Sequence, residues 1–344
     1  MHNINNYQKI LFIVLLAIIL SFFFRGDNPI RGTDTAAYID FFDRIVDYES
    51  LRNIYYMDDY GFSHLSYVIK SISIDSRTYL ILLFFISTVT IFSSYYIFLK
   101  GESSSVFYLA IVLLLFSSSF YLLNINALRQ GISLSFLLMA YSFLFNRRNA
   151  LAVIFLLVAF LFHKSAIFGF IVFFLIFLRY WQGLSLVSFY YCASITGLLI
   201  NIEVIFHILN MFGFSNISEK LNTLSKETTG ITTVEFKMLV LFILVHYFAW
   251  LRMYTNNRLF LFITCIYILT AGLVMLFSSF ESFTNRSLLF FGIVEPIIFA
   301  LSIHCFKKKN EILGIVFLGG MAYFLYVLFH PSFRSELLIS MYAI

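Results

Sequence analysis

Basic and hydrogen-bonding residues recur in short clusters at the ends of long apolar segments. Four clusters cover residues 124–130, 163–165, 281–286 and 330–334, and a fifth covers residues 25–34. Each combines an Arg or Lys with Asn, Gln, His or Thr. An Arg guanidinium presents a planar fork that matches phosphate oxygens and stays charged at any working pH. If the fold brings these clusters to one face, they predict a cationic, hydrogen-bonding site for the phosphate or diphosphate of a lipid.

Plain structural explanations compete with this one for each charged residue. Arg and Lys side chains at helix ends often extend to lipid headgroups, and this explanation is favoured for Lys164 and Arg334. It is weaker for Arg129, which opens an apolar segment with two Asn residues nearby. Asp34 lies close to Arg31, so the two could form a salt bridge that orders the loop instead of serving catalysis.

Two other polar residues also allow a structural and a functional explanation. A single histidine at a helix end, such as His163, is more often an interface residue than a catalytic base. Glu295 lies inside an apolar segment, where a carboxylate is costly unless it is paired or neutral. A structural role is favoured for Glu295, either as the partner of an Arg or as a neutral hydrogen-bonding group.

The elements that carry these clusters are predicted to be membrane-spanning helices. Hydrophobic residues make up 61% of the 344 residues and charged residues only 12%, whereas a soluble domain is nearer a quarter charged. Most apolar runs are long enough to cross about 30 Å of hydrocarbon. Because there is no water in the hydrocarbon to pair with backbone N–H and C=O groups, such runs must be helical. The predicted spans are residues 9–24, 79–99, 106–123, 130–145, 150–162, 165–178, 184–202, 236–254, 258–277, 287–303 and 312–329. The sequence thus predicts an all-α polytopic protein with about eleven spans, in one membrane domain over residues 1–344.

The distribution of charge predicts how this bundle is oriented. With the N-terminus inside, the cytoplasmic loops hold ten basic residues: Lys9, Lys100, Arg147, Arg148, Arg179, Arg252, Arg258 and Lys307 to Lys309. They hold only two acidic residues, Glu102 and Glu311. The positive-inside rule then selects an N-in, C-out topology. Both long polar connections, residues 25–78 and 203–235, fall on the outer side, and residues 61–73 are predicted to form an amphipathic helix there.

Several motifs resemble those of the EpsG family. They are Arg31-Gly-Thr-Asp34 followed by Tyr38 and Phe41-Phe42, Tyr60-Gly-Phe62, the segments 126–131 and 162–166, and Asn285-Arg286. The resemblance runs from about residue 25 to residue 290, and it is the order of the motifs that makes it specific. It implies a bacterial polysaccharide polymerase of the Wzy type, grouped with membrane glycosyltransferases of the GT-C type. Such enzymes need no nucleotide sugar and no cofactor.

The implied reaction joins undecaprenyl-diphosphate-linked oligosaccharide repeat units at the outer face of the bacterial cytoplasmic membrane. It would build O-antigen or a related surface polysaccharide, together with a chain-length regulator and a flippase as possible partners. His163, Asp34 and Arg129 are the candidate catalytic residues. The candidate diphosphate- or substrate-binding residues are Arg31, Arg129, Gln130, Lys164, Arg286 and Arg334. General-base help contributes about 10²–10⁴ in rate, and preorganised Arg charge can stabilise a diphosphate leaving group without a metal ion.

Two other functions remain open from the sequence. A flippase or transporter of the same lipid-linked sugars would need polar groups along a path through the membrane. Here the charge inside the apolar segments is nearly confined to Glu295. An envelope enzyme that transfers acyl groups would need a cytoplasmic entry for its donor, and the predicted inner loops are short. The lipid bilayer is the other expected partner, and the small net charge of +5 gives no reason to expect nucleic acid.

Overall fold

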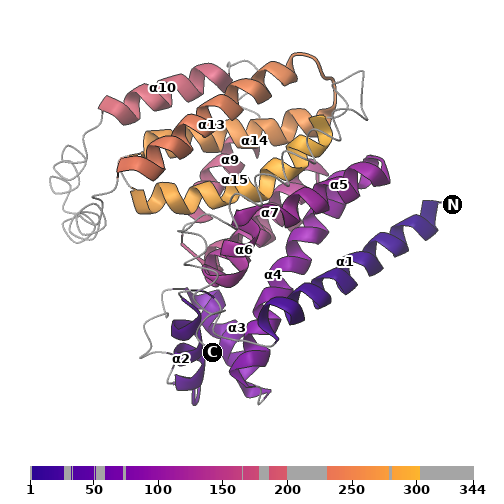
Figure 1. Ribbon diagram of the computed structural model, residues 1–344, viewed down its shortest axis with the longest axis vertical. Helices are drawn as coiled ribbons and strands as arrows, with labels where there is room; N and C mark the ends of the chain where they lie inside the picture. Colours follow the sequence, from indigo (N-terminus) through magenta and orange to yellow (C-terminus); the bar gives the residue numbers. More distant parts are fainter. Residues whose placement is uncertain are drawn as a thin grey trace. The chain divides into compact units, whose positions relative to one another are not determined.

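The computed structural model describes residues 2–26, 32, 34–49, 51, 59–72, 75–164, 166–177, 186–199, 231–278 and 281–302. The regular elements in these segments are helices (Figure 1). They divide into two compact units that meet in the chain between Ile167 and Phe168.

Unit 1 contains eight α-helices and a short 3-10 turn among its described residues. These are α1 (His2–Arg25), α2 (Thr35–Arg44), α3 (Tyr60–Ser71), α4 (Ser76–Phe98), η3 (Leu99–Gly101), α5 (Ser104–Leu115), α6 (Ser118–Ile125), α7 (Leu128–Phe145) and α8 (Asn149–Phe162). Unit 2 contains α10 (Leu186–Leu199), α13 (Ile231–Arg252), α14 (Arg258–Leu276) and α15 (Glu281–Ser302). Between them in sequence lies α9 (Ala166–Phe177).

Several helices are long and apolar enough to cross a membrane. Four candidate spans lie within the described segments: Asn6–Arg25, Ser76–Gly101, Leu128–Phe145 and Arg258–Leu276. The pair α5 and α6 would add a fifth, and α8, α9 and residues 238–252 are shorter apolar helices. The chain is therefore an all-helical, multi-pass membrane protein over the described residues. The structure does not test the number of eleven spans, the topology or the GT-C-like fold, and these stay predictions. The predicted span 312–329 lies outside the described residues.

The predicted span over residues 106–123 is not one continuous helix. It consists of α5 and α6, which are bent by 63°. Three consecutive serines follow Phe116 at the break, and serine is a weak helix former. The hydroxyl of Tyr121 donates a hydrogen bond of 2.7 Å to the carbonyl of Leu115, which is one of the carbonyls that a helix end leaves without an intrahelical partner.

The polar connection over residues 25–78 folds onto the membrane helices. Its helices α2 and α3 bury a cluster with the start of α4, the start of α7 and the end of α8. The cluster consists of Tyr38, Phe41, Phe42, Ile45, Leu51, Phe62, Ile69, Tyr79, Leu80, Leu83, Leu128, Ile132 and Phe162. The amphipathic helix predicted over residues 61–73 is present as α3, although Val68 and Ile72 are exposed while Phe62 and Ile69 are buried. Helix α2 was not predicted from the sequence.

Unit 2 holds its one described acidic side chain half-buried between two helices. The hydroxyl of Tyr267 in α14 donates a hydrogen bond of 2.8 Å to Oε1 of Glu295 in α15. Gly272 makes room for the ring of Phe189, because a Cβ at this position would lie 2.6 Å from Phe189 Cε1. The carboxyl group of Glu295 thus has a hydrogen-bonding partner, as the structural explanation of this residue requires.

Candidate functional site

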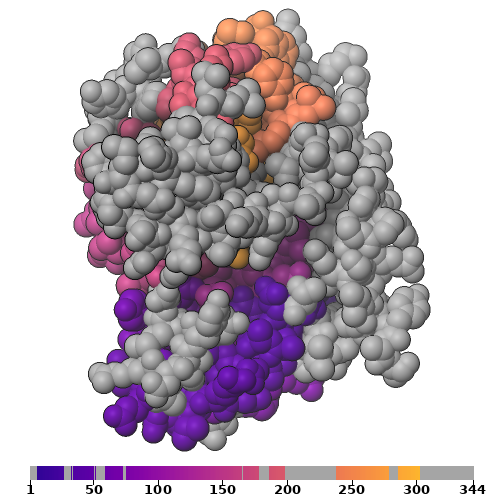
Figure 2. Space-filling model, turned by 90° about the vertical axis from the view of Figure 1, so that its left-hand side faces the viewer, coloured from indigo at the N-terminus to yellow at the C-terminus, as the bar shows by residue number. Residues whose placement is uncertain are grey.

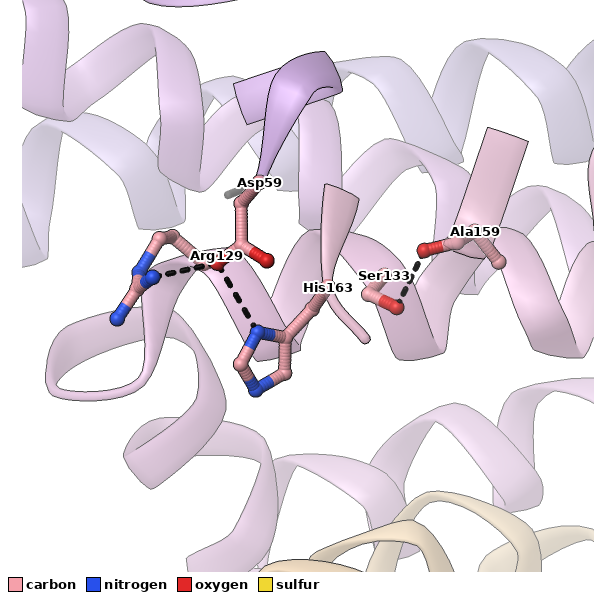
Figure 3. Close-up of polar contacts among 5 residues, drawn as sticks. All are labelled: Asp59, Arg129, Ser133, Ala159 and His163. Atoms are coloured by element: carbon pink, nitrogen blue, oxygen red, sulfur yellow. Dashed lines mark hydrogen bonds and ion pairs between the residues drawn. The ribbon is translucent and has the colours of Figure 1, made fainter. Parts of the chain in front are cut away.

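One carboxylate in unit 1 binds both Arg129 and His163. Oδ2 of Asp59 accepts a hydrogen bond from Nη1 of Arg129, and the two groups form an ion pair. The same oxygen lies 3.1 Å from Nδ1 of His163 (Figure 3). Asp59 is almost completely buried, with 4% of its side chain exposed, whereas Arg129 keeps 25% and His163 13%. The site is therefore a buried anion with two partly exposed basic partners.

Antiparallel packing of α7 against α8 brings the two basic residues together. Arg129 lies in the first turn of α7, and His163 directly follows α8. The hydroxyl of Ser133 donates a hydrogen bond of 2.7 Å to the carbonyl of Ala159 (Figure 3). Ser133 lies one turn after Arg129, and Ala159 one turn before His163, so this bond fixes the register of the two helices next to the site.

Asp59 reaches the site because α3 packs closely against the end of α8. Asp59 is the residue directly before α3, and its carbonyl accepts a hydrogen bond of 3.1 Å from the amide of Ser63. Gly61 faces α8, and a Cβ there would lie 3.0 Å from the carbonyl carbon of Leu161 and from Cδ2 of Phe162. A side chain at this position would press α3 away from α8 and move the carboxylate away from the imidazole.

The surroundings of Asp59 keep it ionised. Burial alone would raise the pKa of its carboxyl group, but the hydrogen bond from His163 and the charges of His163 and Arg129 have the larger combined effect. The pKa of Asp59 is therefore lowered from its ordinary value. The carboxylate can accept the Nδ1–H of a neutral His163, and this tautomer leaves the lone pair of the imidazole on Nε2.

A buried tyrosine also belongs to the site. Tyr38 of α2 is 4% exposed, and burial raises the pKa of its hydroxyl. The charge of Arg129 and a hydrogen bond from its side chain partly offset this effect on Tyr38, whereas the negative charge of Asp34 adds to it. Arg129 thus interacts with both the Asp59 carboxylate and the Tyr38 hydroxyl.

Arg25 has a structural role instead of a place in the site. Its side chain is fully buried. Nη1 donates to Oγ1 of Thr35 at 3.1 Å, and Nη2 donates to the carbonyls of Asn124 and Ile125 at 3.2 and 2.6 Å. These carbonyls belong to the last turn of α6, where they lack intrahelical partners. The guanidinium therefore joins α1, α2 and the α6–α7 turn from which Arg129 projects.

The loop before α2 approaches the same turn very closely. Gly32 has a φ of +95°, a conformation that residues with a side chain rarely adopt. A Cβ on Gly32 would lie 2.0 Å from Oδ1 of Asn126. Glycine is therefore required here for both its backbone conformation and its lack of a side chain.

The structure brings together two of the residues that the sequence singled out, Arg129 and His163. Gln130 is buried in α7, and Lys164 is exposed beside His163. Asp34 is exposed before α2, and the carboxylate that contacts His163 is Asp59. The catalytic or binding roles of the residues that the sequence singled out stay predictions.

Three further candidates belong to unit 2 or lie outside the described residues. Arg286 is exposed and belongs to unit 2, within α15, because that helix starts at Glu281 and includes the polar cluster 281–286. Arg31 and Arg334 lie outside the described residues.

Asp59 is the site residue that sequence reasoning missed. It lies in an acid-rich connection with nine acidic residues between positions 25 and 78, so its type alone does not distinguish it. Its place directly before Tyr60-Gly61-Phe62, a motif already noted, was the available signal. In the part of the chain that the structure describes, no three His, Cys, Asp or Glu side chains are grouped in a way that could hold a metal ion.

Comparison with known proteins gives a family but no individual relative. The sequence profile of the EpsG family matches residues 10–343, which is nearly the whole chain. No curated protein matches the chain, and no solved structure does. The match includes the segments that supply Asp59, Arg129 and His163, and it extends the resemblance seen in the motifs to both ends of the chain. The chain belongs to the EpsG family, and this indicates a membrane protein of polysaccharide biosynthesis.

Proposed function

We propose that this protein polymerises lipid-diphosphate-linked oligosaccharide repeat units into a surface polysaccharide such as O-antigen. The donor would be a growing chain on undecaprenyl diphosphate, and the acceptor a hydroxyl on the terminal sugar of another lipid-linked unit. The reaction forms a glycosidic bond at the anomeric carbon of the donor and breaks its bond to diphosphate. The lipid diphosphate leaves with the electrons of that bond, and the proposed reaction uses no nucleotide sugar and no metal ion.

The observation that carries this proposal is the shared carboxylate of Asp59. By accepting the Nδ1–H of His163, it orients the imidazole so that Nε2 can take the proton from the acceptor hydroxyl. This is the arrangement by which a buried Asp orients a catalytic His in hydrolases that use a serine nucleophile. Here the activated oxygen belongs to a sugar instead of a protein side chain.

The charges in the site bear on how a diphosphate would be held. Arg129 and Asp59 form an ion pair and together carry no net charge. Binding the two phosphates therefore needs additional positive charge. Lys164 is exposed next to His163 and can provide it. Arg31, Arg286 and Arg334 are the further cations that the proposal assigns to the diphosphate.

A flippase is the main alternative, and the placement of polar groups in unit 1 argues against it. Asp59, Arg129 and His163 lie at one end of the packed helices, where α7 starts and α8 ends. An alternating-access transporter holds its substrate near the bilayer midplane and opens to both sides. A site at one end suits chemistry on a substrate that has already crossed the membrane.

The test is the glycan ladder of a gene-deletion strain complemented with Arg129→Ala. We expect the variant to reach the membrane at the wild-type level but to leave glycans of a single repeat unit, because the donor loses its cation and Asp59 loses its partner. Arg44→Ala is the matched control, since Arg44 is an exposed residue of α2 that pairs with Asp40 on the surface. Normal ladders in Arg129→Ala would remove the site from the reaction, and loss of all external glycan in the deletion strain would favour the flippase.

A further inference from the structure

The exposed face of α3 carries a row of aromatic side chains that starts at the site. Tyr60, His64 and Tyr67 are spaced by four and three residues, so they lie on one side of the helix. Tyr60 is 54% exposed and His64 is exposed, whereas Tyr67 is half-buried and packs against the cluster that α2, α3 and α4 share. Since Tyr60 directly follows Asp59, the row begins next to the carboxylate that binds Arg129 and His163.

A fourth ring from a different segment completes this row. Tyr48, which follows α2 and is 52% exposed, packs its ring 5.7 Å from the ring of His64 and 5.6 Å from that of Tyr67. The four residues Tyr48, Tyr60, His64 and Tyr67 are called the aromatic row below. Figure 2 shows a violet surface of the segment that contains α2 and α3, open to the viewer between grey atoms.

The chemistry of the aromatic row differs from that of the exposed face of α8. The exposed large residues of α8 are purely apolar: Leu151, Val153, Ile154, Leu157, Phe160 and Leu161. This composition suits contact with lipid chains. Each ring of the aromatic row instead combines a flat apolar face with a hydroxyl or an imidazole nitrogen at its edge. Such groups suit a ligand that presents both C–H faces and hydroxyl groups.

We propose that the aromatic row binds the sugar chain of the lipid-linked substrate next to the reaction site. The proposal rests on the function proposed above and names the surface that holds the glycan. Pyranose rings present C–H groups on one face, which stack on aromatic rings, while their hydroxyls hydrogen-bond to Tyr and His. From Asp59 to Tyr67 the helix rises about 12 Å, which gives room for a short oligosaccharide leading away from His163.

The competing explanation is that these rings anchor the protein at the membrane surface, where Tyr residues are common. The two explanations predict different contributions from Val68, a non-aromatic residue of α3 that is 53% exposed. An anchor depends on Val68 as well as on the rings, whereas a sugar site depends on the rings alone.

The experiment measures binding of a free oligosaccharide to purified full-length protein in lipid nanodiscs. The probe is one repeat unit of the source strain's polysaccharide without lipid, detected by saturation-transfer NMR and titrated for Kd. We expect Tyr48→Ala and His64→Ala each to weaken binding by about three- to tenfold, the usual effect of one aromatic stacking partner. Tyr48→Phe keeps the stacking face but loses the hydroxyl, so it should weaken binding less than Tyr48→Ala does, and Val68→Ala should match wild type.

The outcomes separate this proposal from the proposed function. Unchanged Kd values in Tyr48→Ala and His64→Ala would overturn it, and so would a Val68→Ala variant that weakens binding as much as Tyr48→Ala does. Arg129→Ala should still bind the probe, because Arg129 is assigned to the diphosphate. If Arg129→Ala makes normal chains while the Tyr48 and His64 variants bind poorly, the reaction assignment fails and the sugar site stands.

Discussion

A single oxygen atom, Oδ2 of Asp59, contacts both Arg129 and His163, so a change at Asp59 alters two partners at once. Asp59→Asn keeps the size of the side chain but removes its charge. We expect polymerisation in membranes to fall about 100-fold or more, within the range that general-base catalysis contributes, because the imidazole is no longer held in one tautomer. The measurement is the rate of ladder formation from lipid-linked repeat units.

The pH dependence of stability gives a second readout of the same variant. Because the pKa of Asp59 is lowered in the folded protein, its pairing stabilises the fold above the ordinary Asp range, and this contribution is lost as pH falls through the lowered pKa. The difference in unfolding free energy between wild type and Asp59→Asn should therefore be present at neutral pH and vanish in acid. Asp34→Asn is the matched control, since Asp34 is an exposed carboxylate of the same connection. Equal losses in both variants would contradict the assignment to Asp59.

At the scale of elements, hydrophobicity predicted most of the described helices but not how they end or meet. The predicted spans 79–99 and 258–277 correspond to α4 (Ser76–Phe98) and α14 (Arg258–Leu276). Helix α2 escaped prediction because it is short and its buried aromatic residues alternate with charged ones. The bend between α5 and α6 combines the three serines at the break with the hydrogen bond from Tyr121 to the carbonyl of Leu115, and hydropathy records neither.

The contacts within the site were harder to predict from the sequence than the helices were. Asp59 and Arg129 are 70 positions apart, and Asp59 and His163 are 104 positions apart. The sequence identified Arg129 and His163 because each interrupts an otherwise apolar pattern. It favoured Asp34 as the carboxylate because Asp34 belongs to the Arg31-Gly-Thr-Asp34 motif. Which acidic residue reaches the imidazole is decided by the close packing of Gly61 against α8, and the motif around Gly61 does not show which distant helix it contacts.

Glycine at position 131 controls the α6–α7 turn that presents Arg129. A Cβ at Gly131 would lie 2.2 Å from the carbonyl oxygen of Leu123, so one of the two helices must move in Gly131→Ala. We expect the protein to lose about 1–3 kcal/mol of stability, as overpacking does, together with most of its activity. Thermal unfolding in detergent and the glycan ladder measure the two effects. Gly101→Ala is the control, because nothing lies within 4 Å of its added Cβ, and equal losses in both variants would show that the α6–α7 contact is unimportant.

At the scale of the molecule, unit 1 has two chemically different ends. Arg25, Asp59, Arg129 and His163 gather where α1 and α8 end and α7 begins. At the opposite end, the Nδ2 of Asn146 donates a hydrogen bond of 3.4 Å to the carbonyl of Ile97, so the ends of α4 and α7 lie together. The basic residues Lys100, Arg147 and Arg148 follow these helix ends. Which end faces the cytoplasm stays a prediction of the positive-inside rule, which places the end with Lys100, Arg147 and Arg148 inside.

The proposed reaction requires the predicted topology, because lipid-linked repeat units that have been flipped are available only at the outer face. We expect a membrane-impermeant maleimide to label Val46→Cys in intact cells, since Val46 is 84% exposed in the connection that carries the site. Lys100→Cys, at the opposite end of unit 1, should be labelled only after the membrane is permeabilised. Both variants are made after Cys192, Cys265 and Cys305 have been replaced by Ser, so that each protein holds one thiol. The reverse pattern would place Asp59 and His163 on the cytoplasmic side, where a polymerase of flipped units could not act, and a reaction on units before export would then have to replace the one proposed.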